Sequence, residues 1–174
     1  MYSFKTLYRA DLFRYDSRCD LYTRLLLRFF RKSQTCNAPF LFWCYKVLFQ
    51  ILAHKHQLEI YSRCNIGKGL YLGHAYNITI NGKAVIGDNC NLHKGVTIGQ
   101  ENRGVREGSP TIGNCVWIGI NATIVGNIKI GDDVLIAPNS FMNKDIPSHS
   151  VVFGNPCVIK KVNNATEGYI CNIA

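Results

Sequence analysis

The sequence predicts a mainly β fold, in which a parallel β-helix of hexapeptide repeats follows a short α-helical segment. Two observations lead to this prediction. From residue 60 onward, aliphatic residues recur at a step of six, and glycine often follows them. Before that point, apolar residues recur at the three- and four-residue spacing of an α-helix. We therefore expect a helical segment over 1–57, a β-helix domain over 58–155 and a C-terminal tail over 156–174.

The helical segment contains two well-marked amphipathic stretches. Apolar residues at 22, 25, 26, 29 and 30 alternate with arginines, and Asp20 is placed to cap that helix. Pro39 marks a second start, because proline is tolerated in the first helical turn. The helix that follows is apolar on nearly all sides. We expect it to be buried in this protein or against a partner.

Charge and cysteine content limit the possible partners. The chain carries a net charge of +9, and residues 1–65, with 11 Lys and Arg against 4 Asp and Glu, supply +7 of it. Such a surplus suits an anionic membrane, a nucleic acid, a polyanionic substrate or simply a solvated face. We expect no nucleic-acid partner, and a peripheral membrane contact through the basic helices. The eight cysteines include no CxxC pair, so we expect no metal site and a cytoplasmic location, extending to the inner membrane surface. The apolar run 38–53 is interrupted by Lys46 and too short to span a bilayer.

The repeat itself is regular. Three hexads of about 18 residues close one triangular coil, the aliphatic residue points into the prism, and hexapeptide helices of this kind are left-handed. Each inward side chain contributes roughly 1.5–3 kcal/mol when it is buried. The aliphatic positions are Ile60, Ile66, Leu72, Ile80, Ile86, Leu92, Ile98, Ile112, Ile118, Ile124, Ile130 and Ile136, followed by Met142.

Two interruptions of this step point to function. The step from Ile98 to Ile112 predicts a protruding, charged loop over 99–111. The step from Leu72 to Ile80 is eight, and His74 lies at this break. If the hexads starting at 60, 66 and 72 form faces one, two and three, Glu59 lies at the corner that His74 approaches one coil later. A carboxylate there would fix the tautomer of His74 and raise its basicity.

At these residues the chain resembles the serine acetyltransferase group of hexapeptide acyltransferases. The matching stretches are "IGKGLYLGHAYNITINGKAVIGDNCNLHKGVTIG" (66–99) and "PTIGNCVWIGINATIVGNIKIGDDVLIAPNSFMNKDIPSHSVVFGNPCVIK" (110–160). The family pattern G-[KR]-G-x-x-x-D-H-A-T-G is met in part by residues 67–77, V-T-[IL]-G is met at 96–99, and G-x-P-A-[KR] is partly kept after Gly154.

The resemblance implies an acetyl-CoA-dependent O-acetyltransferase, bacterial in type, that forms trimers with active sites between neighbouring prisms. His74 matches the catalytic histidine of the family, and Glu59 matches its partner carboxylate, which is usually Asp. Coenzyme A contacts of the family map onto Ile120 and Pro138, and Lys160 with Lys161 could meet its phosphates.

The departures concern the acceptor. Gly73 replaces the family's Asp, and Ser109, after Gly108, replaces a substrate-binding His that follows an Arg. His93 lies one coil after His74 and is a second candidate for acceptor contact. Because the amino-acid pairing set is largely missing, the residues favour a sugar hydroxyl of a surface polysaccharide. Serine O-acetyltransferase of cysteine biosynthesis is the alternative.

A third alternative is a metal-dependent β-helix protein of the γ-carbonic anhydrase type, which needs three converging imidazoles. His74 and His93 could supply two, but His149 lies beyond the last regular coil.

Overall fold

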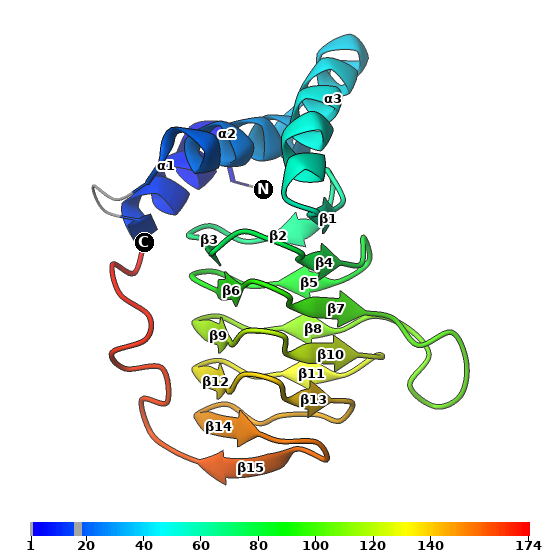
Figure 1. Cartoon of the computed structure of the whole chain (residues 1–174), viewed down its shortest axis with the longest axis vertical. Coiled ribbons are helices and arrows are strands. Elements are labelled where there is room, and N and C mark those ends of the chain that lie inside the picture. Colours follow the sequence, from blue (N-terminus) through cyan, green and yellow to red (C-terminus); the bar gives the residue numbers. More distant parts are fainter. Residues whose placement is uncertain (1, 16–18) are drawn as a thin grey trace.

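The computed structural model describes residues 2–15 and 19–174, and Met1 and residues 16–18 of the predicted helical segment lie outside the described residues. Three helices come first: α1 (Phe4–Tyr15), α2 (Leu21–Thr35) and α3 (Pro39–Lys55). Short strands then wind into a parallel β-helix with the helices over its first coil (Figure 1). The predicted fold class, a parallel β-helix with a short N-terminal helical region, is confirmed.

The strands form three sheets, one for each face of the prism. Face one contains β1 (Glu59–Ile60), β4 (Thr79–Ile80), β7 (Thr97–Gly99), β10 (Thr123–Val125) and β13 (Phe141–Met142). Face two contains β2 (Asn65–Ile66), β5 (Val85–Ile86), β8 (Thr111–Ile112) and β11 (Lys129–Ile130). Face three contains β3 (Tyr71–Gly73), β6 (Asn91–His93), β9 (Val116–Ile118), β12 (Val134–Ile136), β14 (Ser150–Phe153) and β15 (Val158–Lys161).

The register follows the predicted phase of the repeat. Ile60 pairs with Ile80, and Leu72 with Leu92, so hexads one turn apart stack face on face. Ile98 pairs with Ile124 on face one, so the coil resumes in phase after the 99–111 loop. That loop projects from the prism (Figure 1). The inward aliphatic residues of the middle coils are fully buried and make one continuous core.

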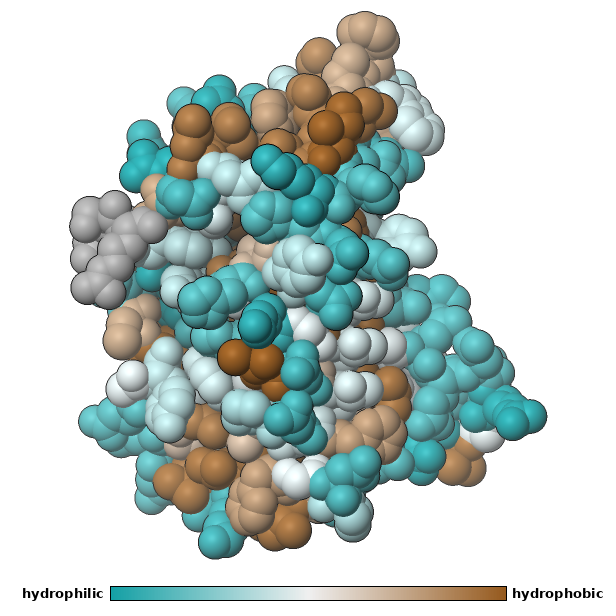
Figure 2. Space-filling view, viewed as in Figure 1, coloured by the Kyte–Doolittle hydropathy of each residue, from teal (hydrophilic) through white to brown (hydrophobic). Residues whose placement is uncertain are grey.

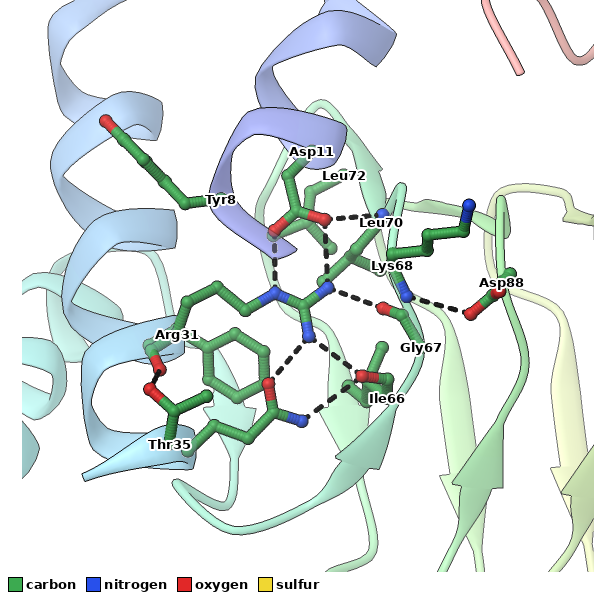
Figure 3. Close-up of polar contacts among 12 residues, drawn as sticks. Tyr8, Asp11, Arg31, Thr35, Ile66, Gly67, Lys68, Leu70, Leu72 and Asp88 are labelled. Carbon is green, nitrogen blue, oxygen red and sulfur yellow. Dashed lines mark hydrogen bonds and ion pairs between the residues drawn. The ribbon is translucent and has the colours of Figure 1, made fainter. Parts of the chain in front are cut away.

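A buried ion pair joins the helices to the open end of the prism (Figure 3). Arg31 of α2 donates from Nε to Asp11 Oδ2 at 2.7 Å and from Nη2 to Asp11 Oδ1 at 2.9 Å, and both side chains are 0% exposed. The same guanidinium donates to the carbonyl oxygens of Ile66 and Gly67, and Asp11 accepts the N–H of Leu70. The pair thus satisfies backbone groups of the first coil that have no preceding coil to pair with.

The expected starts of α2 and α3 are confirmed, because Asp20 accepts the N–H of Thr23 at 3.0 Å and Pro39 opens α3. The chain itself, however, does not bury α3. Phe40, Trp43 and Ile51 are 78%, 57% and 63% exposed, and brown apolar side chains gather over this helix in Figure 2. Only one side of α3 packs on α2 and the first coil, because the helix projects away from the prism (Figure 1). No helix within the described residues is long and apolar enough to cross a membrane.

The C-terminal segment, predicted as a tail, packs against the prism. β15 pairs antiparallel with β14, and the chain then turns back along the prism toward α1 (Figure 1). Asp133 accepts the N–H groups of Ala165 and Thr166, and Asn91 donates to the carbonyl oxygen of Tyr169 at 3.3 Å. The segment therefore covers part of face three.

Candidate active site

His74 lies where the coil leaves its regular path. It follows β3 with a φ of 53°, and its side chain is exposed. The two extra residues of this hexad form a bulge that the end of α3 holds in place. Here the N–H of Asn77 donates to the carbonyl oxygen of His56 at 2.9 Å, and the carbonyl oxygen of Ala75 lies 2.9 Å from His56 Nδ1. The break in the six-residue step therefore turns His74 outward and fixes the backbone that carries it.

The corner between faces three and one aligns His74 with two other predicted residues, Ile120 and Pro138, and with Lys94, which the sequence did not single out. The pairings of Gly73 with His93, Leu92 with Ile118 and Ile118 with Ile136 place Lys94, Ile120 and Pro138 below His74, one in each successive coil. Neighbouring coils stack roughly 4.8 Å apart, so Pro138, three coils below, lies roughly 14 Å from His74 along this edge. We call this line of four residues, His74, Lys94, Ile120 and Pro138, the His74 edge.

His74 also lines a cavity of about 700 Å³ between the prism and the helices, which we call the His74 cavity. Asp20, Lys55 and Lys94 bring both signs of charge to its wall, and Tyr22 and Tyr76 bring aromatic surface. The ring of Tyr22 stacks on that of His56 with centroids 4.0 Å apart. Sequence analysis missed His56, Lys55 and the cavity role of Asp20. The sequence places these residues at helix ends, but nothing in it indicates that the helix ends lie near His74.

Asp20 stays ionised in this cavity. Burial alone would raise its pKa, but the hydroxyl and N–H of Thr23 and the N–H of Tyr22 lower it below the usual range. At neutral pH the cavity therefore holds one carboxylate beside the two lysine side chains.

Gly73 and His93 fit each other. A Cβ atom at Gly73 would lie 2.4 Å from Nδ1 and 2.5 Å from Cε1 of His93, which occupies the space of any side chain at position 73. Burial lowers the pKa of His93, and the charge of His74 lowers it further. The glycine that replaces the family's Asp is therefore the residue that accommodates a second imidazole beside His74.

Other predicted site residues lie apart from His74. Glu59, exposed on β1, lines a different cavity beneath α3, and within the described residues it makes no hydrogen bond with His74. Its predicted pairing with His74 stays a prediction. Ser109 donates to Asn81 Oδ1 at 3.1 Å, at the base of the 99–111 loop. Lys160 and Lys161 are exposed on β15, at the far end of the prism.

Comparison with known proteins adds a family context to this geometry. The model of the bacterial transferase hexapeptide (six repeats) matches residues 109–144. Serine acetyltransferase 4 of Arabidopsis thaliana is 41% identical over 99 residues, which are 57% of this chain and 28% of the relative. The serine acetyltransferase of Synechococcus elongatus is 33% identical over 122 residues, 66% of this chain and 50% of the relative.

Solved structures agree over a larger part of the chain. Apo soybean serine acetyltransferase has a TM-score of 0.77 at 28% identity, covering 91% of this chain and 69% of that one. In both sequence and fold, the chain is thus similar to serine acetyltransferases. The Brucella abortus serine acetyltransferase in complex with coenzyme A matches with a TM-score of 0.76 at 26% identity, over 91% of this chain and 68% of that one.

This serine acetyltransferase-like chain spans about half or less of the length of the curated relatives it matches. Among residues 2–15 and 19–174, no three His, Cys, Asp or Glu side chains are arranged to hold a metal ion.

Proposed function

We propose that the chain is an acetyl-CoA-dependent O-acetyltransferase in which His74 is the general base. One observation carries the proposal: an exposed imidazole stands at a break in the coil, beside a cavity of about 700 Å³, in a chain whose relatives are serine acetyltransferases. A hydroxyl is a poor nucleophile at neutral pH. A positioned imidazole that takes its proton during attack on the thioester carbonyl contributes about 10²–10⁴-fold to the rate.

The His74 edge suits acetyl-CoA as the co-substrate. Ile120 and Pro138 present a mostly apolar strip below His74, on which an extended pantetheine arm can lie with its thioester near the imidazole. Lys94, one coil below His74, is the nearest cation on that edge. In this arrangement the exposed Lys160 and Lys161 are left for the phosphates at the distant end of the coenzyme. The Brucella abortus relative crystallised with coenzyme A supports this choice of donor.

L-Serine is the acceptor that the comparisons favour, and the cavity supplies opposite charges for it. The ionised carboxylate of Asp20 can pair with an α-ammonium group, and Lys55 and Lys94 can pair with an α-carboxylate. These groups come from other positions than Gly73 and Ser109, where the family residues are missing. A soybean relative crystallised with serine supports the same choice.

A sugar hydroxyl is the second candidate, and the aromatic wall of the His74 cavity favours it. Tyr15, Tyr22, Tyr71 and Tyr76 line the cavity. Aromatic surface with a few polar groups is typical of sites for neutral small molecules. On this reading the acceptor belongs to a surface polysaccharide, and the charges of Asp20 and the lysines do not pair with it.

One experiment separates the two acceptors. Release of free coenzyme A is followed with acetyl-CoA plus L-serine, and then with a panel of sugars and glycans. Asp20→Asn keeps a good helix cap but removes the charge. For L-serine we expect its KM to rise about tenfold, because a charge-assisted contact is lost, with kcat little changed. Robust turnover with a sugar that Asp20→Asn leaves unchanged, and none with L-serine, would establish the second candidate instead.

We also propose a homotrimer, located in the cytoplasm, with peripheral membrane contact through α3. The exposed Phe40, Trp43 and Ile51 and the absence of Asp and Glu from α3 support the membrane contact, and Lys46 and Lys55 provide charge for anionic lipid. Light scattering should give three times the 19.6 kDa chain mass. Sedimentation with anionic vesicles, weakened by Trp43→Glu, would support the membrane contact. Equal binding of the variant would contradict it.

A further inference from the structure

A second cavity lies beside the His74 cavity, between α1, face three and the C-terminal segment. Its volume is about 420 Å³, and we call it the Arg14 cavity. Arg14 comes from α1, His93 and Trp117 from face three, and Tyr169 from the C-terminal segment. His93 and two tyrosine side chains line both cavities.

Three buried nitrogen atoms on the wall of this cavity have no hydrogen-bond partner within the described part of the chain. Arg14 is 5% exposed, and its Nη2 donates to Asn91 Oδ1. Its Nε and Nη1 are shielded from solvent and bond to none of the described residues, and the same holds for Nε2 of His93. Buried polar atoms without partners are rare, because each costs the full free energy of removing it from water.

Among residues 2–15 and 19–174, no carboxylate pairs with the charge of Arg14. The ion pairs within the described residues are Asp11 with Arg31, Glu101 with Arg106 and Asp133 with His149, and none includes Arg14. Burial lowers the pKa of its guanidinium, and the groups that oppose this are thiols and one phenol rather than carboxylates. Because an unpaired buried cation is costly, a bound anion would stabilise this part of the molecule.

The other walls are aromatic. The rings of His93 and Trp117 have centroids 4.7 Å apart, and those of Trp117 and Tyr169 are 5.1 Å apart. Tyr71 continues this row above His93, at 6.3 Å. A cavity with a buried cation at one point and ring surface elsewhere suits a ligand with one anionic group and an apolar body.

We propose that the Arg14 cavity binds a small organic carboxylate, whose oxygens accept hydrogen bonds from Arg14 and His93 while its body packs on Trp117 and Tyr169. This ligand is separate from the acceptor and from acetyl-CoA, because it occupies the Arg14 cavity rather than the His74 cavity. The guanidinium of Arg14 neutralises the charge of the ligand, and the C-terminal segment covers the bound ligand.

Trp117 makes the proposal measurable. The chain has two tryptophans, and Trp43 lies on the exposed face of α3. In a Trp43→Phe protein, fluorescence therefore reports on the Arg14 cavity alone. We would titrate this protein with cyclohexanecarboxylate, with the neutral cyclohexanecarboxamide of the same shape, and with inorganic phosphate. We expect a saturable change in emission with the carboxylate only.

Variants test the role of Arg14. Arg14→Met should weaken carboxylate binding by about tenfold or more, because a charge-assisted contact is lost. Arg9→Met, an exposed arginine on the same helix, should leave binding unchanged. If Arg14→Met fails to fold, Arg14→Lys replaces it as the test. This variant keeps the positive charge, so it should fold and bind the carboxylate more weakly than the parent protein does.

Several results would overturn the proposal. No saturable response to the carboxylate would mean that ordered water satisfies the buried donors. An equal response to the amide, or one unchanged in Arg14→Met, would exclude recognition of charge. Binding of phosphate without binding of the carboxylate would exclude the proposed ligand class.

Discussion

The contact between Gly73 and His93 gives the sharpest prediction about how the site is built. In Gly73→Ala the new Cβ would lie 2.4 Å from His93 Nδ1, whereas ordinary van der Waals contact begins at 3.4 Å. The imidazole must therefore move by about 1 Å. Overpacking of this kind costs about 1–3 kcal/mol. In a chain of this length each kcal/mol lowers Tm by about 2–4 °C.

A double-mutant cycle isolates this contact. The free energy of unfolding is measured by urea denaturation for Gly73→Ala, His93→Ala and the double variant. Once the ring is removed, the alanine at 73 has room, so its cost should fall below about 0.5 kcal/mol. Gly99→Ala is the matched control. Gly99 also lies in a strand, and its Cβ would meet only Val125 Cγ1, at 3.3 Å.

The reasoning would be refuted if Gly73→Ala cost the same with and without the ring of His93. It would also be refuted if Gly99→Ala were as damaging as Gly73→Ala, since the cost would then come from the backbone.

Three further predictions concern other parts of the chain. Burial and the charge of His74 lower the pKa of His93, so near pH 6 the unfolded state binds a proton more readily than the native state does, and the free energy of unfolding should fall as pH drops below about 6.5. His93→Gln should flatten this part of the plot of unfolding free energy against pH, and an unchanged slope in that plot would contradict the prediction. Arg31→Met leaves its buried carboxylate partner unpaired and should cost about 3–5 kcal/mol in urea unfolding, whereas a cost under about 1 kcal/mol would refute the anchoring role. Burial raises the pKa of Cys90 to about 12, so an aromatic disulfide reagent should modify the exposed Cys171 first and Cys90 only on unfolding, and early modification of Cys90 would contradict its burial.

The fold was predictable because its information is local. A six-residue step places one aliphatic side chain in each strand, and the phase deduced from Ile60, Ile66 and Leu72 is the phase of the three faces. The same phase placed His93 one coil below the hexad of His74. It also carried the signal that was missed, since a glycine at 73 in register with a ring at 93 leaves that ring space to pack.

Much of the site could not be predicted, because helices with no register to the repeat contribute to it. Asp20 was recognised as a cap, yet its place beside His74 depends on how α2 lies over the prism. That placement rests on Arg31 and Asp11, whose pairing no periodic pattern indicates. The exposure of α3 was missed for a related reason, since apolar composition indicates a surface to be covered but not what covers it.

The central claim is that His74 removes the acceptor's proton, and a single comparison of turnover tests it. Release of coenzyme A from acetyl-CoA is measured at saturating acceptor, with L-serine first, for the wild-type chain, His74→Gln and the control His54→Gln. His54 is exposed on α3, outside the His74 cavity. We predict that kcat of His74→Gln falls by about 10²–10⁴-fold, with the fold intact by circular dichroism and His54→Gln near wild type. Turnover in His74→Gln close to that of the wild type would contradict the account.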